Sequence, residues 1–177
     1  MTRVLLADDH PFIRAGVEAV LRASRYQVLA TAASGSEALA ALDAATPDVC
    51  LLDVRMPGLT GVEVLERMRG AGNPCPVVLL TAELDDDVLL AAVRAGVEGI
   101  VLKDRAGDEL VACLDAVAGG GRSIPPDLLQ RALDLSLEGG GGRWPGWRRA
   151  SERLPRSSPK VCAIARWPLG SACRKER

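Results

Sequence analysis

The first 120 residues of the chain predict an α/β fold, in which a doubly wound parallel sheet is covered by helices on both faces. Five short stretches are almost entirely apolar, as expected for strands that are buried on both sides. Segments with helical apolar spacing separate them, and neighbouring parallel strands need crossovers of this kind. The whole chain of 177 residues is 48% apolar and 25% charged, which is typical of a globular protein and argues against a disordered or membrane-embedded chain.

The expected strands and helices follow one another in strict alternation. The strands are predicted at Val4–Ala7, Tyr26–Ala30, Val49–Leu52, Val77–Leu80 and Gly99–Leu102. Apolar residues recur at helical spacing over Ile13–Leu21, Ala38–Leu42, Val62–Met68, Val88–Val93 and Leu110–Val117. His10 and Pro11 are expected to begin the first helix, because proline is favoured in the first helical turn.

Polar side chains stand at the carboxyl ends of four of these strands. Asp8 and Asp9 follow the first strand, and Asp53 follows the third. Thr81 follows the fourth strand and Lys103 the fifth. Ligands of open α/β sheets bind at the carboxyl ends of the strands, so we expect these five side chains to meet at one edge of the sheet.

These residue types predict a metal-assisted phosphoryl acceptor. Clustered carboxylates repel one another unless a cation lies between them, and oxygen ligands favour Mg²⁺ over Zn²⁺, so Asp8, Asp9 and Asp53 are the expected ligands. A carboxylate beside a divalent cation and an ammonium is suited to accept a phosphoryl group, which assigns Asp53 as the acceptor and Thr81 and Lys103 as its catalytic partners. An aspartate after a strand can also be a helix cap or turn residue, and for Asp8 alone both interpretations stay open.

Four segments carry a resemblance to a known family: Val4–Pro11, Leu51–Gly61, Leu80–Ala82 and Val101–Lys103. Together they resemble the receiver domain of bacterial two-component response regulators. The resemblance covers about the first 120 residues and implies a flavodoxin-like receiver fold with strand order 2-1-3-4-5. It also implies a phosphoprotein that acts in a phosphorelay and is not an enzyme.

The resemblance further implies roles for individual residues. Asp53 would take a phosphoryl group from a sensor histidine kinase, while Mg²⁺ is held by Asp9, Asp53 and the backbone carbonyl of Arg55, with Asp8 assisting through water. Thr81 and Lys103 would contact the phosphoryl oxygens.

The family's output is a changed protein surface, formed by the fourth helix, fifth strand and fifth helix, on which a phosphorylated homodimer can form. The family's aromatic switch residue lies three positions before the lysine, and Ile100 stands there in this chain. A coupling between Thr81 and an aromatic ring is therefore not expected here. In addition, the residue after Lys103 is Asp104 instead of the proline common among receivers.

Two further segments, Ala7–Pro11 and Gly119–Pro126, resemble the NarL/FixJ (LuxR-type) subfamily of transcription regulators. In that subfamily a linker helix leads to a DNA-binding helix-turn-helix domain. We therefore assign residues 1–120 to the receiver domain and 121–138 to a linker helix. DNA binding is expected of the subfamily.

Residues 139–177 differ in character from the rest and form an irregular basic tail. They carry 10 basic and 2 acidic side chains, whereas the first 125 residues carry 11 and 18, and all three tryptophans lie in the tail. Four prolines interrupt any helix long enough to enter a major groove: Pro145, Pro155, Pro159 and Pro168. No recognition helix can be placed, so the tail is interpreted as a disordered basic extension or as the product of a shifted reading frame.

A shifted frame can be tested on the protein sequence, because each shifted codon takes two bases from the first two of the next codon. With a suitable choice of codons, residues 149–171 permit a sequence that resembles the start of a LuxR-type helix-turn-helix, with Glu, Gly and Asn at matching spacing. This hypothesis predicts that the chain has lost the DNA-binding half of its ancestor.

Two other functional classes are alternatives for this sequence. One is a single-domain regulator that acts by protein contact and has a genuine basic tail. The other is a haloacid-dehalogenase-like phosphatase, but that family has a second aspartate two residues after the first, and Arg55 stands at this position.

Five cysteines occur without CxxC spacing: Cys50, Cys75, Cys113, Cys162 and Cys173. Their odd number and spacing indicate neither a disulfide framework nor a zinc site, and we interpret them as small apolar residues or free thiols. The first expected strand begins without a preceding signal peptide, so a cytoplasmic protein with no membrane partner is expected.

Overall fold

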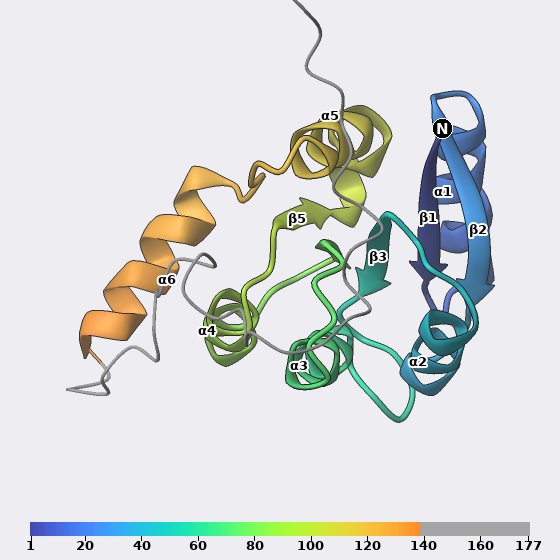
Figure 1. Cartoon of the computed structure of the whole chain (residues 1–177). Coiled ribbons are helices and arrows are strands. Elements are labelled where there is room, and N and C mark those ends of the chain that lie inside the picture. Colours follow the sequence, from blue (N-terminus) through green and yellow to red (C-terminus); the bar gives the residue numbers. More distant parts are fainter. Residues whose placement is uncertain (139–177) are drawn as a thin grey trace, which may run out of the picture. The chain divides into compact units, whose positions relative to one another are not determined.

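A computed structural model describes residues 1–138 of the chain, and they form a five-stranded parallel sheet flanked by helices (Figure 1). The strand order is β2-β1-β3-β4-β5, as the sequence predicts. The strands are β1 (Thr2–Ala7), β2 (Tyr26–Ala32), β3 (Val49–Asp53), β4 (Val77–Thr81) and β5 (Gly99–Leu102). The helices are α1 (Pro11–Arg22), α2 (Gly35–Ala44), α3 (Gly61–Gly70), α4 (Asp86–Arg94), α5 (Ala106–Ala118) and α6 (Pro126–Glu138), and a 3₁₀ turn, η1 (Lys103–Arg105), precedes α5.

Strand β1 is longer than its apolar residues indicate. It begins at Thr2 instead of Val4, because Thr2 and Arg3 pair with Tyr26 and Gln27 of β2. Backbone pairing with a neighbouring strand does not require an apolar side chain, so an apolar pattern underestimates strand length at such positions. Helix α1 begins at Pro11 directly after His10, as predicted.

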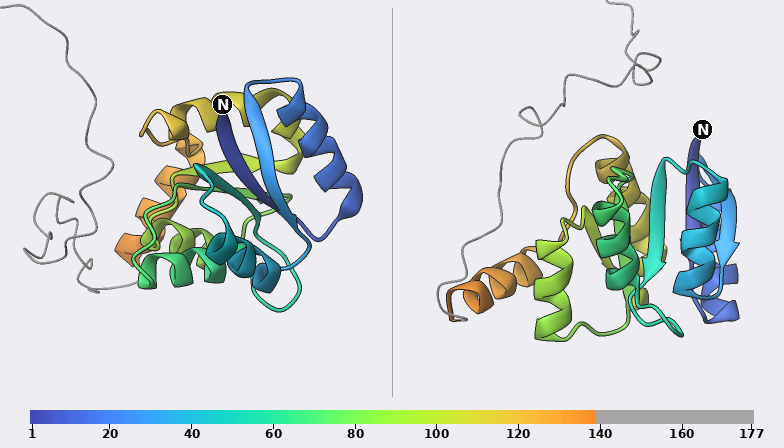
Figure 2. Two further views of the ribbon diagram at one scale, coloured as in Figure 1. Left: turned by 45° about the vertical axis from the view of Figure 1, so that its right-hand side comes forward. Right: turned by 60° about the horizontal axis from the view of Figure 1, so that its bottom comes forward.

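Successive residues of the strands belong alternately to two separate apolar clusters, one on each face of the sheet. Leu5, Leu52 and Leu79 belong to the cluster that is covered by α2, α3, α4 and α6. Leu6 and Leu51 belong to the cluster on the other face, which is covered by α1 and α5 (Figure 2). This period of two within each strand explains why the strands are apolar at almost every position.

The loop after β3 is fixed by the start of α3. The backbone N–H of Glu63 donates to the Thr60 hydroxyl at 3.2 Å, and the backbone N–H of Thr60 donates to the Glu63 carboxylate at 2.8 Å. This reciprocal capping satisfies two donors that a helix start otherwise leaves free. Gly61, the first residue of α3, donates its backbone N–H to the Val54 carbonyl oxygen at 3.1 Å. The residues that follow Asp53 are thereby held in one conformation.

Helix α6 confirms that a further helix follows the five-stranded fold, and it lies against α4. Leu128 and Ala132 are buried in the apolar cluster that α4 also covers. The Arg131 guanidinium forms an ion pair with Asp86 at the start of α4. Leu137, in contrast, is exposed. The predicted basic tail, in which no recognition helix is expected, comprises residues 139–177 and lies outside the described residues.

Within residues 1–138, none of the helices combines the length and the apolar character that crossing a lipid bilayer requires.

Gly61 is predicted to be intolerant of a side chain. A Cβ atom there would lie 2.3 Å from the Asp53 carbonyl oxygen. We expect Gly61→Ala to lower the free energy of unfolding by about 1–3 kcal/mol, because the backbone of β3 must shift to relieve the clash. Urea denaturation measures this change.

The matched control is Gly16→Ala in α1, where a Cβ atom meets nothing within 4 Å. Alanine at this helical position should stabilise the protein by about 0.5–1 kcal/mol. Equal stabilities for Gly61→Ala and the wild type would contradict the close approach of α3 to β3.

Candidate functional site

A partly buried lysine lies between two buried aspartates at the carboxyl edge of the sheet. Asp8 directly follows β1, Asp53 is the last residue of β3, and Lys103 directly follows β5. The Lys103 Nζ atom lies 2.8 Å from Asp53 Oδ2 and 2.9 Å from Asp8 Oδ2. Asp8 is 0% exposed and Asp53 2% exposed. The sheet thus brings these three predicted site residues together.

Asp9 and His10 complete a cluster of possible metal ligands with Asp8 and Asp53. One ligand atom from each of the four residues lies within 4.8 Å of the others. Oδ2 of Asp8 and Oδ1 of Asp9 are buried and accept no hydrogen bond from the described residues. Lys103 Nζ lies 2.9 Å from the Asp8 atom and His10 Nδ1 lies 2.7 Å from the Asp9 atom, in both cases without hydrogen-bond geometry.

Buried oxygen atoms that lack hydrogen bonds are costly, and a divalent cation would satisfy them. The three carboxylates are the oxygen donors that Mg²⁺ prefers, so the residues present fit this ion. The sequence did not single out the contact of His10 with Asp9. The position of His10 directly after two acidic residues was the only signal for it.

The site shifts the pKa values of its two central groups. Burial raises the pKa of Asp53 above its ordinary value, although the hydrogen bond from Lys103 acts in the opposite direction. Burial lowers the pKa of Lys103, but the contacts with Asp53 and Asp8 outweigh it, so the pKa of Lys103 is raised. Lys103 therefore stays charged and compensates the negative charge that Asp53 carries when it is ionised.

Backbone contacts orient the two buried aspartates. The backbone N–H of Arg55 donates to Asp53 Oδ1 at 3.2 Å, and the backbone N–H of His10 donates to Asp8 Oδ1 at 2.8 Å. The Arg14 guanidinium donates to the Asp8 carbonyl oxygen at 2.7 Å. Asp53 thus has one oxygen bound to a backbone donor and the other bound to Lys103.

Two predicted switch residues do not contact the carboxylates. Thr81 is buried at the end of β4, where its hydroxyl donates to the Glu83 carbonyl oxygen at 2.5 Å. Ile100, at the position of the family's aromatic residue, is buried in the apolar cluster on the α4 side of the sheet. A contact between Thr81 and a group on Asp53 would require the hydroxyl to leave Glu83.

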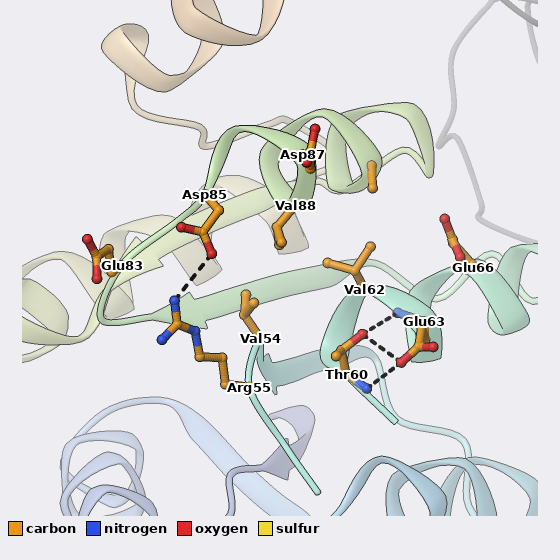
Figure 3. Close-up of a pocket in the computed structure, with 11 residues that line it drawn as sticks. Val54, Arg55, Thr60, Val62, Glu63, Glu66, Glu83, Asp85, Asp87 and Val88 are labelled. Atoms are coloured by element: carbon orange, nitrogen blue, oxygen red, sulfur yellow. Dashed lines mark hydrogen bonds and ion pairs between the residues drawn. The ribbon is translucent and has the colours of Figure 1, made fainter. Parts of the chain in front are cut away.

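A hollow of about 420 Å³ lies between α3 and α4, beside the loop that follows Asp53 (Figure 3). Val54, Val62 and Val88 line it, and several carboxylates surround it. Arg55 and Asp85 form an ion pair across 3.3 Å between the β3–α3 and β4–α4 loops. None of the acidic cluster residues lines this hollow, although Arg55, two residues after Asp53, does.

Comparison with known families identifies one match, the "Response regulator receiver domain", over residues 4–115. The similar proteins include the "DNA-binding transcriptional activator DevR/DosR" of Mycobacterium tuberculosis, which is 36% identical over 140 residues. That alignment covers 78% of this chain and 64% of the relative. The "Nitrate/nitrite response regulator protein NarL" of Escherichia coli is 30% identical over 135 residues, with 76% and 62% covered. The chain thus spans less than two thirds of the length of these relatives.

Solved structures of similar proteins share the fold. A LuxR-family two-component response regulator from Aurantimonas sp. is 31% identical with a TM-score of 0.69, covering 77% of this chain and 99% of the other. The signal receiver domain of the putative response regulator NarL from Mycobacterium tuberculosis is 37% identical with a TM-score of 0.64, covering 67% and 97%.

The central place of Lys103 predicts how the pKa of Asp53 responds to its removal. In Lys103→Met the Asp53 carboxylate loses its cation, so its pKa should rise further above the ordinary value. A carboxyl group whose pKa is raised in the folded state destabilises the folded protein as the pH rises and the group ionises. Above pH about 4, the free energy of unfolding of the variant should therefore fall more steeply with pH than that of the wild type. Carbon-detected NMR of the carboxyl groups and urea denaturation measure the two effects.

Arg105→Met serves as the control, because Arg105 is an exposed cation whose contact is with Glu109. This variant should leave the titration of Asp53 unchanged. An unchanged Asp53 titration in Lys103→Met would show that the ammonium does not govern the site.

Proposed function

Because the chain belongs to the response regulator receiver family, we propose that Asp53 accepts a phosphoryl group from a sensor histidine kinase in a reaction that requires Mg²⁺. A receiver domain is a phosphoacceptor and not an enzyme, in agreement with the class predicted for the first 120 residues. The observation that carries the proposal is the buried Asp53 carboxylate, bound by Lys103 and grouped with Asp8 and Asp9.

We assign Asp8, Asp9 and Asp53 to the metal ion, together with the carbonyl oxygen of Arg55. Mg²⁺, when bound, would neutralise charge on the transferring phosphoryl oxygens. The acidic donor set and the two buried oxygens without hydrogen bonds support this assignment. His10 lies beside Asp9 and is an imidazole in an otherwise oxygen-based set, so it is not assigned as a ligand.

Phosphoryl transfer would proceed by attack of an Asp53 carboxylate oxygen on phosphorus. The bond between phosphorus and the donor's leaving atom breaks, and the donor keeps that electron pair. A phosphoryl group carries a charge of about −1.5 to −2. Lys103 remains protonated and stabilises this added negative charge. The raised pKa of Lys103 supports this role, since the ammonium form is favoured.

We further propose that Thr81 transmits the modification to the surface around α4, β5 and α5. Its hydroxyl would leave the Glu83 carbonyl oxygen and donate to a phosphoryl oxygen, which would move the loop that begins α4. Helix α6 contacts α4 through the Arg131–Asp86 ion pair, so a shift of α4 would also displace α6. Ile100 offers no aromatic ring for this coupling and is buried in the apolar cluster on the α4 side of the sheet.

The ancestral output proposed for this chain is control of transcription, with the receiver in residues 1–120 and the linker in 121–138. A relative of this chain is named a DNA-binding transcriptional activator, which supports the proposal. We propose that residues 139–177 stem from a shifted reading frame, so that DNA binding is not assigned to this chain. A regulator that acts by protein contact and has a genuine tail is the second candidate, favoured by the basic, tryptophan-containing composition of that segment.

Substitution of Asp53 tests the proposed acceptor. Asp53→Asn removes the nucleophilic carboxylate but keeps its shape, so labelling by radioactive acetyl phosphate in the presence of Mg²⁺ should fall to background. The wild type should be labelled with Mg²⁺ and not after chelation by EDTA.

Asp85→Asn is the matched control, because Asp85 is an exposed aspartate beside the site whose contact is with Arg55. It should be labelled to the wild-type level. Persistent labelling of Asp53→Asn would refute the assignment of the acceptor.

Sequencing of the DNA from the codon of Glu138 to beyond that of Arg177 tests the proposed origin of the tail. The shifted-frame account predicts that another frame continues into a complete helix-turn-helix. Absence of such a frame would contradict it and would make the basic tail a genuine part of a single-domain regulator.

A further inference from the structure

Two cysteine thiols lie against each other at the amino ends of two neighbouring strands, whereas the acidic cluster lies at the carboxyl ends. Cys50 is the second residue of β3, and Cys75 lies in the loop that precedes β4. Their Sγ atoms are 3.5 Å apart. We propose that they form an oxidation site, in which a hydroperoxide oxidises Cys75 and Cys50 then closes a disulfide with it.

The loop that carries Cys75 is anchored, so the thiol pair does not depend on a chance approach. The backbone N–H of Cys75 donates to the Asn73 side chain at 2.9 Å. The Arg69 guanidinium donates to the carbonyl oxygens of Cys75 and Asn73, each at 2.9 Å. Glu98 holds Arg69 from the other side with two contacts of 2.9 Å.

Backbone pairing fixes the second thiol as well. The backbone N–H of Cys50 donates to the Pro76 carbonyl oxygen at 2.8 Å, which ties β3 to the residue next to Cys75. A disulfide needs an S–S distance of about 2 Å, so the sulfurs must approach each other by about 1.5 Å. The two thiols are therefore neighbours, and the proposed bond needs only this short approach.

The two thiols differ in access and acidity, which assigns the order of reaction. Cys50 is fully buried, whereas Cys75 is only half-buried. The contact with the Cys50 thiol lowers the pKa of Cys75, although burial and the charges of Glu98 and Asp48 act in the opposite direction. The same contact and burial raise the pKa of Cys50. Because the thiolate is the form that reacts with peroxides, Cys75 is the thiol attacked first.

A hydroperoxide is the only co-reactant that the proposed oxidation needs. The Cys75 thiolate attacks the terminal peroxide oxygen, the O–O bond breaks, and Cys75 becomes a sulfenic acid while an alkoxide or hydroxide leaves. The sulfur of Cys50 then attacks the Cys75 sulfur, and the sulfenic oxygen departs as water with the thiol proton. Two thiols are oxidised by two electrons, and one hydroperoxide is reduced.

Cys113 supplies an internal control. It is buried in the cluster on the other face of the sheet, and its sulfur lies 3.8 Å from the Ser123 carbonyl oxygen. Among residues 1–138 it has no neighbouring thiol comparable to the Cys50–Cys75 pair. Its pKa is raised by burial, so it should react slowly.

The test uses the reduced full chain, treated with hydrogen peroxide, blocked with an alkylating reagent and digested without reductant. Mass spectrometry should detect a peptide pair linked through Cys50 and Cys75, and treatment with dithiothreitol should remove the link. Two results would overturn the proposal. One is disulfide links that involve only the tail cysteines; the other is that Cys50 and Cys75 stay unlinked although another peroxide-reactive thiol has been completely oxidised.

Variants assign the order of the steps. Cys50→Ala should leave Cys75 as a sulfenic acid that a dimedone probe labels, whereas Cys75→Ala should abolish labelling at Cys50. Cys113→Ala should form the Cys50–Cys75 link at the wild-type rate. Dimedone labelling of Cys50 in Cys75→Ala, at a level equal to that of Cys75 in Cys50→Ala, would contradict the assigned order.

This site and the proposed phosphoacceptor are separable, because they lie at opposite ends of β3. Cys75→Ala should accept a phosphoryl group from acetyl phosphate as the wild type does. Failure of the disulfide would therefore leave the assignment of Asp53 intact, and failure of Asp53 labelling would leave the thiol chemistry intact.

Discussion

Two buried carboxylates, Asp8 and Asp53, are held at the ends of β1 and β3 by one ammonium group, that of Lys103 at the end of β5. Buried charges persist only when they are paired, so the close approach of these side chains depends on the lysine. The parallel sheet makes this possible, because it delivers all three strand ends to the same edge. The proposed metal ligands, the proposed acceptor and the proposed route toward α4 are arranged around this contact.

The sheet separates two kinds of chemistry along β3. Its last residue, Asp53, belongs to the acidic cluster, and its second residue, Cys50, lies against the Cys75 thiol. Gly61 of α3 lies directly on the backbone of Asp53, which leaves the Asp53 backbone little freedom to move. The proposed signal from Asp53 would therefore travel through side chains that can reorient, and the Thr81 hydroxyl, which donates to the Glu83 carbonyl oxygen, is proposed as such a group.

The sheet order and the gathering of Asp8, Asp9, Asp53 and Lys103 were predictable, because parallel strands place their carboxyl ends together. The orientation of the Thr81 hydroxyl was not, since a local contact with Glu83 decides it. The cysteine pair was also missed, because Cys50 and Cys75 are 25 residues apart and lack a CxxC spacing. The register of β3 and β4 contained the signal, since Cys50 pairs with Val77, two residues after Cys75.

The chemical identity of the modified residue tests the central claim most directly. The chain is treated with acetyl phosphate and Mg²⁺, reduced with borohydride and digested, since borohydride converts an aspartyl phosphate to homoserine. Mass spectrometry of the peptides should find homoserine at position 53 and aspartate at positions 8 and 9. Homoserine at Asp8 or Asp9 with unmodified Asp53, or phosphate retained on the Thr81 hydroxyl, would contradict the account.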